Sequence, residues 1–310
     1  MQFHSPLRTF PKVPTSLRVL LTALALFLIG QPGYTSDAQR QPAVSDIQPQ
    51  MSPVEPAEPV VTLLDMRDFA WREGGLRQAY FQDREIIEND DVIELDAPGR
   101  ADDGTKVPLK ISAKIPQTEE RYIKTVTVLI DNNPSPFAGR FMFTPKSGNA
   151  NLFLRVRVND YTAIRAIAET NDGELFMSKR FVKASGGCSA PPPPDMEKAL
   201  ERMGKMTFRT RTEAPVEPIA AMLNIRHPNT TGMQFYHVTQ EFIPAHYVQT
   251  VNITFNGEYV MTAETGFSMS EDPSLGFYFV PDRDGELRAE ITDSEGLSFT
   301  KVHKLKVVQD

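Results

Sequence analysis

The sequence predicts an all-β protein with two β-sandwich domains in tandem, short helices near the N-terminal end and a proline-rich linker. Runs that alternate apolar and polar residues, as half-buried strands do, recur along the chain with turn residues between them. They form two groups on either side of Pro191–Pro194. The groups share motifs, such as Ile164–Ala166 and Leu287–Ala289, at an offset of about 124 residues. These patterns favour two copies of one sandwich plan, with chance similarity between β-rich sequences as the alternative.

The first 38 residues have the pattern of a cleaved export signal. Three basic residues precede the apolar run Val19–Ile29, which is too short to span a bilayer and is followed by glycine and proline. Small residues at 36–38 supply a cleavage site, with 33–35 as an alternative. We therefore expect residues 1–38 to be removed and the mature protein to be periplasmic, without a stable membrane span. An uncleaved anchor is the alternative.

The charge of the chain limits the classes of partner. Its 310 residues include 33 Lys and Arg and 40 Asp and Glu, which give a net charge of −7, and the two signs are interspersed. A nucleic-acid-binding protein needs a basic stripe to neutralise phosphates, and the sequence contains none. We therefore expect no nucleic-acid partner.

The mature chain begins with a segment that differs in character from the domains. Residues 39–60 are proline-rich and lack periodicity, so we expect a disordered tether. The first domain, 61–190, then opens with apolar residues over 63–71, a break at Gly74-Gly75 and further apolar residues over 76–80. This pattern predicts one or two short amphipathic helices whose aromatic residues serve as packing anchors.

Strand patterns occupy the rest of both domains. In the first domain they cover Val107–Ile115, Ile123–Ile130, Leu152–Val158, Ala163–Ala168 and Leu175–Val182. In the second, 205–310, they cover Met206–Arg211, Ile219–Ile225, Val248–Phe255, Phe277–Val280, Leu287–Ile291 and Leu297–Val308. The linker, 191–204, combines the four prolines with a short helix that Asp195 caps and Gly204 ends.

The first domain ends at the one cysteine of the chain, Cys188, which follows Gly186 and Gly187. The glycines allow positive φ angles and end the preceding strand, while the proline tract that follows is stiff. No apolar periodicity is present to bury the sulfur. We therefore expect an exposed thiol on a flexible glycine stalk at the rim of a sheet. No histidine or cation lies close to Cys188 in the sequence, so the pKa of its thiol should stay near the usual 8.5. A partner's active site would then have to activate the thiol.

A single cysteine in an exported chain cannot form an internal disulfide. Cys188 is therefore a working thiol, an intermolecular bridge or an inert residue in a linker. A thiol protease would need a distant histidine to act as its base.

No other pattern indicates a site. The five histidines, at positions 4, 227, 237, 246 and 303, lack metal-ligand spacing and are best interpreted as satisfied core or surface residues. No glycine-rich phosphate loop lies between a strand and a helix. We expect neither a metal nor another cofactor.

Two sets of short motifs carry a resemblance to a known family. In the first domain they are Lys124–Val128, Asn133-Pro134, Phe143–Pro145, Ser147-Gly148, Arg155–Val158 and Gly186–Cys188. In the second they are His227-Pro228, Thr231-Gly232, Thr254–Gly257, Phe277–Val280 and Thr292-Asp293. These motifs resemble the SoxYZ sulfur carriers, and specifically the single-chain SoxYZ-like carriers associated with quinoprotein dehydrogenases. The first region is similar to SoxY and the second to SoxZ, and together they cover most of the mature chain.

The resemblance implies two immunoglobulin-like sandwiches and a carrier that is not itself an enzyme and needs no cofactor. Cys188 would hold sulfur intermediates covalently, and Gly186 and Gly187 would form the swinging arm. The sequence departs from the family pattern because Ser189, Ala190 and the prolines follow the cysteine, whereas the family's arm ends at a free C-terminus. Cys188 could then enter a partner's cleft only as a loop. The halves are also fused into one chain.

The sequence therefore predicts a periplasmic carrier that presents sulfur-containing cargo on Cys188 to periplasmic redox or sulfur-processing enzymes, such as a quinoprotein dehydrogenase or a c-type cytochrome. The alternative is an accessory protein for such a dehydrogenase or cytochrome, in which the thiol is incidental. A third possibility is a homodimer joined by an intermolecular disulfide.

Overall fold

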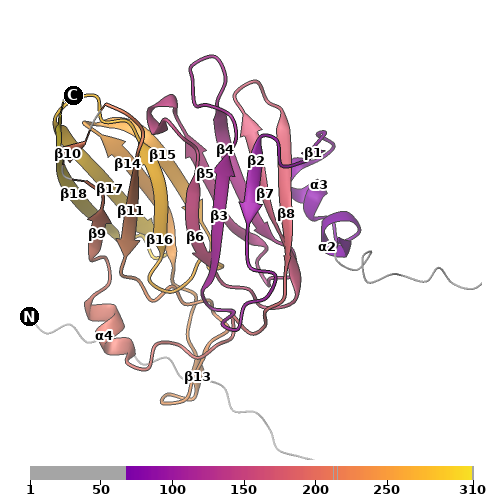
Figure 1. Ribbon diagram of the computed structural model, residues 1–310. Coiled ribbons are helices and arrows are strands. Elements are labelled where there is room, and N and C mark those ends of the chain that lie inside the picture. Colours follow the sequence, from indigo (N-terminus) through magenta and orange to yellow (C-terminus); the bar gives the residue numbers. More distant parts are fainter. Residues whose placement is uncertain (1–67, 212, 215, 309–310) are drawn as a thin grey trace, which may run out of the picture. The chain divides into compact units, whose positions relative to one another are not determined.

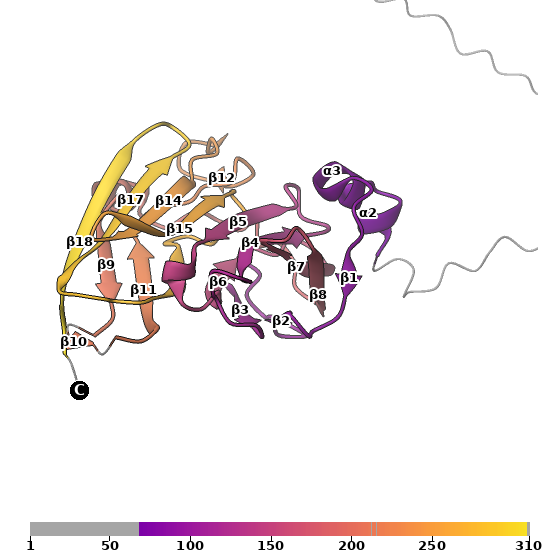
Figure 2. The ribbon, with the colours of Figure 1, turned by 90° about the horizontal axis from the view of Figure 1, so that it is seen from above.

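Alternating side chains place the strands in two layers, seen edge-on in Figure 2. In β3 (Val107–Ala113), Val107, Leu109 and Ile111 are buried while Pro108 and Lys110 are exposed. The structure, a computed structural model, describes residues 68–211, 213–214 and 216–308. The predicted signal at 1–38 and tether at 39–60 lie outside these residues, as does the beginning of the predicted helical segment.

The larger layer is a ten-stranded sheet (Figure 1). Its strands in spatial order are β1 (Ile87–Glu88), β8 (Leu175–Val182), β7 (Thr162–Thr170), β4 (Ile123–Ile130), β5 (Phe137–Phe143), β15 (Glu258–Thr265), β14 (Val248–Phe255), β17 (Gly285–Asp293), β18 (Ser298–Val307) and β10 (Glu213–Ala214). The second layer has six strands, in the order β2 (Ile93–Asp96), β3, β6 (Leu152–Val156), β16 (Ser274–Phe279), β11 (Ile219–Ile225) and β9 (Met206–Arg209). A separate ribbon is formed by β12 (Phe235–Tyr236) and β13 (Glu241–Phe242).

The two halves of the chain repeat one plan. Outward from its centre, the large sheet runs β5, β4, β7, β8, β1 in one half and β15, β14, β17, β18, β10 in the other. The small sheet likewise runs β6, β3, β2 and β16, β11, β9. The outermost strands of the large sheet, β1 and β10, both pair in parallel with their neighbours. This order confirms the predicted pair of immunoglobulin-like sandwiches.

Both sheets continue from one half into the other. In the large sheet, β5 and β15 pair antiparallel from Phe143 opposite Met261 to Gly139 opposite Thr265. In the small sheet, β6 and β16 meet at Phe153 and Gly276, and one cluster of buried apolar residues extends through both halves. The halves are therefore joined through backbone and core as well as through the linker. The boundaries at 61–190, 191–204 and 205–310 stay a prediction.

Two short helices lie at the end of the first half that is away from the second (Figures 1 and 2). They are α2 (Phe69–Arg72) and α3 (Leu76–Phe81), separated at Gly74-Gly75 as the sequence predicts. Their buried aromatic residues, Trp71 and Phe81, pack against side chains of the large sheet, namely Leu129, Ile167, Leu175 and Met177. The helices thereby cover a face of β4, β7 and β8 that would otherwise expose apolar area to water. None of the helices in the described part of the chain is long and apolar enough to cross a membrane.

A buried ion pair accompanies this contact. Arg165 of β7 is fully buried, and its Nε lies 3.0 Å from each carboxylate oxygen of Asp131. Its Nη2 donates to Asp131 at 2.7 Å and to Asp68, just before α2, at 2.5 Å. The guanidinium carbon also lies 4.5 Å from the centre of the Trp71 ring. Charge and packing together hold the helices against the sheet.

The linker is ordered. Pro192 and Pro193 are buried, and α4 (Met196–Glu201) follows them. Asp195 caps this helix by accepting a hydrogen bond from Lys198 N at 3.0 Å, and Gly204 has a φ of 78°. The predicted cap at Asp195 is confirmed. The predicted stop at Gly204 is wrong, because the helix already ends at Glu201 with Arg202 as its C-cap.

Candidate functional site

Cys188 lies in a turn that begins where β8 ends. The chain leaves β8 at Val182, and Lys183 pairs in parallel with Arg100. Beyond this bridge the chain folds back over the end of the sandwich. Gly186 N donates to Asn159 O at 2.9 Å, and Ala190 N donates to Gly186 O at 2.9 Å. The cysteine is therefore at the tip of a closed, hydrogen-bonded turn.

The expectation of an exposed thiol is wrong, because Cys188 is buried with 0% exposure. The amide of Cys188 donates to Asn159 Oδ1 at 3.2 Å, and Gly187 N donates to Val158 O at 3.1 Å. These contacts hold the turn against the segment after β6, so the side chain faces inward. The neighbouring Ser189 is exposed.

The two glycines are needed for this close packing. A Cβ on Gly187 would lie 2.1 Å from the carbonyl oxygen of Gly104, closer than any side chain can approach. Gly186 has open space around it but a φ of 71°, which favours glycine. In this conformation the glycines shape a turn. Their role as a movable arm stays a prediction.

The second half of the chain holds the turn closed. Thr231 Oγ1 donates to Cys188 O at 2.6 Å, and Gln234 Nε2 donates to Ala190 O at 3.1 Å. From the first half, Arg157 Nη1 donates to Gly187 O at 3.1 Å. We call these three side chains the latch. None of the three was predicted as a site residue, because their contacts join positions far apart in the chain.

The surroundings change the acidity of the thiol. Burial raises the pKa of Cys188 to about 11, and the positive charge of Arg157 opposes this effect without cancelling it. The expectation of a pKa near 8.5 is therefore wrong. At neutral pH the thiol is protonated, and it is a poor nucleophile while the turn is closed.

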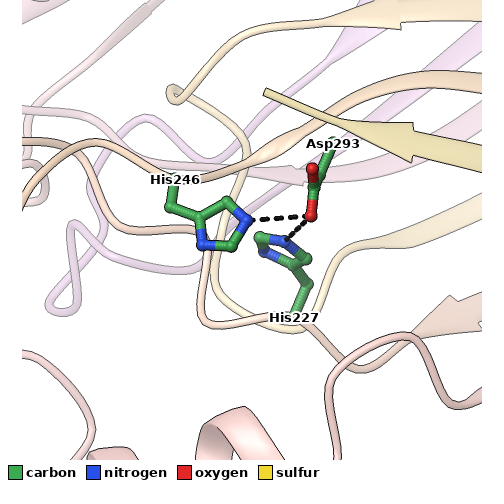
Figure 3. A group of neighbouring side chains, drawn as sticks. All are labelled: His227, His246 and Asp293. Carbon is green, nitrogen blue, oxygen red and sulfur yellow. Dashed lines mark hydrogen bonds and ion pairs between the residues drawn. The ribbon is translucent and has the colours of Figure 1, made fainter. Parts of the chain in front are cut away.

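Two histidines that the sequence places 19 positions apart meet at one carboxylate (Figure 3). His246 Nε2 lies 2.8 Å from Asp293 Oδ2, and His227 Nε2 lies 3.6 Å from the same oxygen. Candidate ligand atoms of the three residues lie within 4.8 Å of one another. The interpretation as satisfied residues fits His246, but buried His227 Nε2 has no hydrogen-bond partner in the part of the chain that the structure describes.

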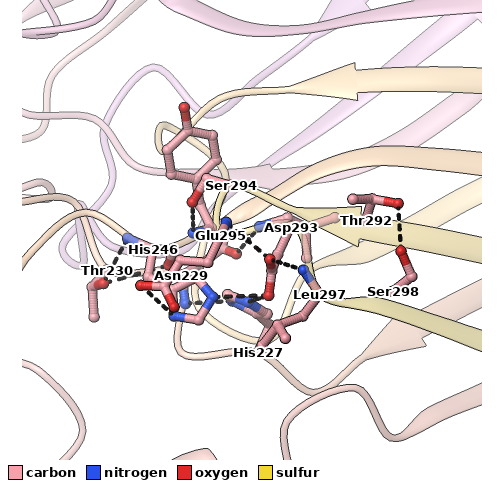
Figure 4. Close-up of polar contacts among 12 residues, drawn as sticks. His227, Asn229, Thr230, His246, Thr292, Asp293, Ser294, Glu295, Leu297 and Ser298 are labelled. Atoms are coloured by element: carbon pink, nitrogen blue, oxygen red, sulfur yellow. Dashed lines mark hydrogen bonds and ion pairs between the residues drawn. The ribbon is translucent and has the colours of Figure 1, made fainter.

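Hydrogen bonds around this group decide whether it suits a metal ion (Figure 4). The backbone N–H of Asn229 donates to His227 Nδ1 at 3.1 Å. Nδ1 must therefore carry the lone pair, and in neutral imidazole the proton then resides on Nε2. A metal-ligating histidine has the opposite arrangement, in which the other ring nitrogen donates. Asp293 Oδ1 also accepts from the backbone N–H groups of Glu295 and Leu297, at 3.0 and 2.9 Å. The group is built as a hydrogen-bonded support.

This support is continuous with the latch. The stretch from His227 to Thr231 connects the histidine pair to the carbonyl of Cys188. Thr230 exchanges backbone hydrogen bonds with His246 at 2.8 and 3.1 Å, and Asn229 Oδ1 accepts from Val248 N at 3.0 Å. The histidine pair therefore fixes the backbone that presents Thr231 to the turn.

Two protein-family models match the chain, one in each half. The family model described as "Sulfur oxidation protein SoxY" matches residues 77–188, and that described as "Sulphur oxidation protein SoxZ" matches residues 208–304. The chain is a SoxY–SoxZ fusion. In this fusion the SoxY match ends at Cys188, while Thr231, Gln234 and the histidine pair belong to the SoxZ part. The SoxZ part therefore supplies contacts that close the turn at the end of the SoxY part.

Similar solved structures include the sulfur carrier protein SoxY from Chlorobium limicola f thiosulfatophilum, at 23% identity and a TM-score of 0.31, over 37% of the fusion and 93% of that chain. The superoxide reductase (neelaredoxin) from Ignicoccus hospitalis matches at 15% identity and a TM-score of 0.29, over 32% of the fusion and 94% of that chain. Both TM-scores are below 0.5. No curated protein sequence matches the fusion.

The burial of His227 predicts a pH-dependent stability. Burial and the neighbouring His246 lower the pKa of His227 to about 4, although Asp293 opposes the shift. An unfolded histidine has a pKa near 6.5, so the unfolded chain binds more protons between pH 6.5 and 4. The free energy of unfolding should therefore fall by up to about 3 kcal/mol as pH drops through this range.

This dependence is measurable by urea unfolding of wild type and His227→Asn between pH 7 and 4. Asparagine keeps an acceptor near the position of Nδ1 but does not titrate, so the variant should lose less stability on acidification. Exposed His237→Asn is the matched control and should follow wild type. If the free energy of unfolding fell equally with pH in wild type and His227→Asn, His227 would not be the source of the pH dependence.

Proposed function

We propose that the fusion is a periplasmic carrier that holds a sulfur-containing intermediate covalently on Cys188 and presents it to partner enzymes without catalysing a reaction itself. One observation carries the proposal: the SoxY family match ends at the single cysteine of the chain, which follows two glycines. The assignment of Gly186 and Gly187 as a movable arm belongs to this proposal. So do export to the periplasm and the absence of a cofactor.

The closed turn implies that the carrier has a shielded resting form. To load or unload cargo, the turn must release the contacts from Asn159 and the latch, and Cys188 then emerges as a loop because the chain continues into buried Pro192 and Pro193. Each hydrogen bond contributes about 0.5–1.5 kcal/mol net, and water replaces it on opening. Gly186 and Gly187 supply the backbone freedom for this movement.

The raised pKa of the thiol determines what a partner enzyme must do. With a pKa of about 11 in the closed form, Cys188 is almost entirely protonated at neutral pH. A partner's active site must therefore admit the loop and take up its proton. Sulfur-processing and redox enzymes of the periplasm, including a quinoprotein dehydrogenase or a c-type cytochrome, are the proposed class.

The burial of Cys188 favours a second candidate function. A sulfur with 0% exposure would also fit an accessory protein for an exported quinoprotein dehydrogenase or cytochrome, in which the thiol only packs. The same burial argues against an intermolecular disulfide, because the sulfur cannot reach another chain while the turn is closed.

Intact-mass spectrometry of protein isolated from its native compartment separates these functions. The carrier function predicts a fraction of molecules with added sulfur mass on Cys188, and loss of sulfur-dependent activity in Cys188→Ser. Exposed Ser189→Ala is the matched control and should retain both properties. An unmodified thiol in every molecule, with full activity in Cys188→Ser, would remove the carrier function and leave the accessory one.

A further inference from the structure

A buried positive charge beside Cys188 lacks a carboxylate partner. Arg157 is 2% exposed, and its guanidinium forms no ion pair with a carboxylate of the described residues. Its Nη1 donates to Gly187 O at 3.1 Å and its Nη2 to Asn229 O at 3.2 Å, while buried Nε has no hydrogen-bond partner among those residues. Arg165, the other deeply buried arginine described here, is paired with Asp131 and Asp68.

Such an arrangement costs free energy, because buried charges are normally paired and fully hydrogen-bonded. Burial lowers the pKa of Arg157, whereas the negative forms of Cys188, Glu271 and Asp103 would raise it, with Cys188 contributing most. The free Nε and its neighbouring Nη form the edge of a guanidinium that binds oxyanions in a bidentate manner. The guanidinium next to the cysteine backbone therefore keeps a donor that can bind an anion.

We propose that Arg157 binds the anionic end of the group that Cys188 carries, so that the closed turn shelters negatively charged sulfur adducts, such as a persulfide or a sulfonate-terminated disulfide. This rests on the proposed carrier function. In the empty carrier the two carbonyls solvate the guanidinium without neutralising it. In the loaded carrier the adduct supplies the missing negative charge.

The position of Arg157 is fixed in advance. The backbone N–H of Arg157 donates to Ser268 O at 2.7 Å, and its backbone carbonyl accepts from Asn133 Nδ2 at 2.8 Å. Two residues later, Asn159 holds the amide of Cys188. One short segment thus presents both the cation and a contact to the cysteine backbone. A pre-positioned cation loses little conformational entropy when an anion binds.

The test compares an anionic adduct with a neutral one on the same sulfur. In urea, the Cys188 thiolate displaces thiosulfate from tetrathionate: the bond from Sγ to sulfur forms, the central sulfur–sulfur bond breaks, and thiosulfate leaves with the electron pair. The thiol proton goes to solvent, and the product ends in a sulfonate. Methyl methanethiosulfonate gives the neutral methyl disulfide, with methanesulfinate leaving. Both forms are refolded by removing the urea.

Release of each adduct by dithiothreitol is followed by mass spectrometry and expressed relative to the same adduct on the unfolded chain. In wild type we expect about tenfold more protection for the anionic adduct than for the neutral one. Arg157→Gln should abolish the difference, and Arg157→Lys should keep part of it. Exposed Arg155→Gln, two residues away in β6, is the matched control and should behave as wild type.

Equal protection of the two adducts in wild type, or an unchanged difference in Arg157→Gln, would overturn the inference. If Arg157→Gln does not fold, thermal unfolding of the wild-type adducts decides, and the anionic form must melt higher than the neutral one. Failure of this inference can be distinguished from failure of the proposed function, because the adducts are made in vitro. Native protein without cargo but with the charge preference would contradict the proposed function alone. Native cargo without the preference would contradict this inference alone.

Discussion

Native Cys188 should react with Ellman's reagent at pH 7.5 at least about 100-fold more slowly than the same cysteine in the unfolded chain. A pKa of about 11 reduces the thiolate fraction by about two orders of magnitude relative to a thiol near 8.5. The full burial of the sulfur adds steric protection. The measurement is the pseudo-first-order rate with and without 6 M guanidinium. Similar rates in the two conditions would show that the turn is open in solution.

A latch variant tests whether the hydrogen bonds of the turn control this protection. Thr231→Val nearly conserves shape but removes the 2.6 Å bond to Cys188 O. If the free energy of opening the turn falls by about 1 kcal/mol, the rate rises about fivefold. Thr210→Val is the matched control, because Thr210 Oγ1 also donates to a backbone carbonyl, that of Ala220 at 2.9 Å, away from the turn. Its rate should equal that of wild type.

Asp131→Ala should lower the free energy of unfolding by about 3–5 kcal/mol, because it leaves the guanidinium of Arg165 buried with Asp68 as its single carboxylate partner. Asp131 is itself buried, so water cannot readily replace the lost carboxylate. Chemical denaturation monitored by the fluorescence of Trp71, which lies against Arg165, measures the change.

The control for this substitution is Arg288→Ala. Arg288 forms an ion pair with Glu290 at 2.8 Å, but both side chains are about half exposed. Exposed pairs contribute little, so the variant should unfold close to wild type. A loss in Asp131→Ala no larger than that in Arg288→Ala would show that the buried pair is not a major source of stability.

The internal repeat shows what local sequence patterns can and cannot predict. The motifs at Ile164–Ala166 and Leu287–Ala289 identify corresponding strands, β7 and β17, which occupy equivalent places in the two halves of the large sheet. Yet the arginine at the centre of the first motif is buried and that of the second is exposed. The difference arises because α2 and α3 cover β7, and no strand pattern contains that information.

The site was predicted less completely than the fold. The sequence indicates Cys188 and its glycines, but the burial of the sulfur depends on Asn159, Thr231 and Gln234, which lie 29 to 46 positions away. Local composition predicted exposure because it cannot include contacts of this range. The meeting of His227 and His246 at Asp293 was missed for the same reason. His227 follows β11, His246 precedes β14 and Asp293 ends β17, so the three residues are far apart in the sequence.

The continuous ladder between β5 and β15 has a consequence for stoichiometry. Two separate polypeptides joined at such a seam would dissociate on dilution, and a thiol-bearing partner could be exchanged between complexes. Here one chain carries both parts, so each SoxZ part retains one SoxY part and its single thiol at every concentration. The ratio of thiol to SoxZ part is therefore fixed at one to one.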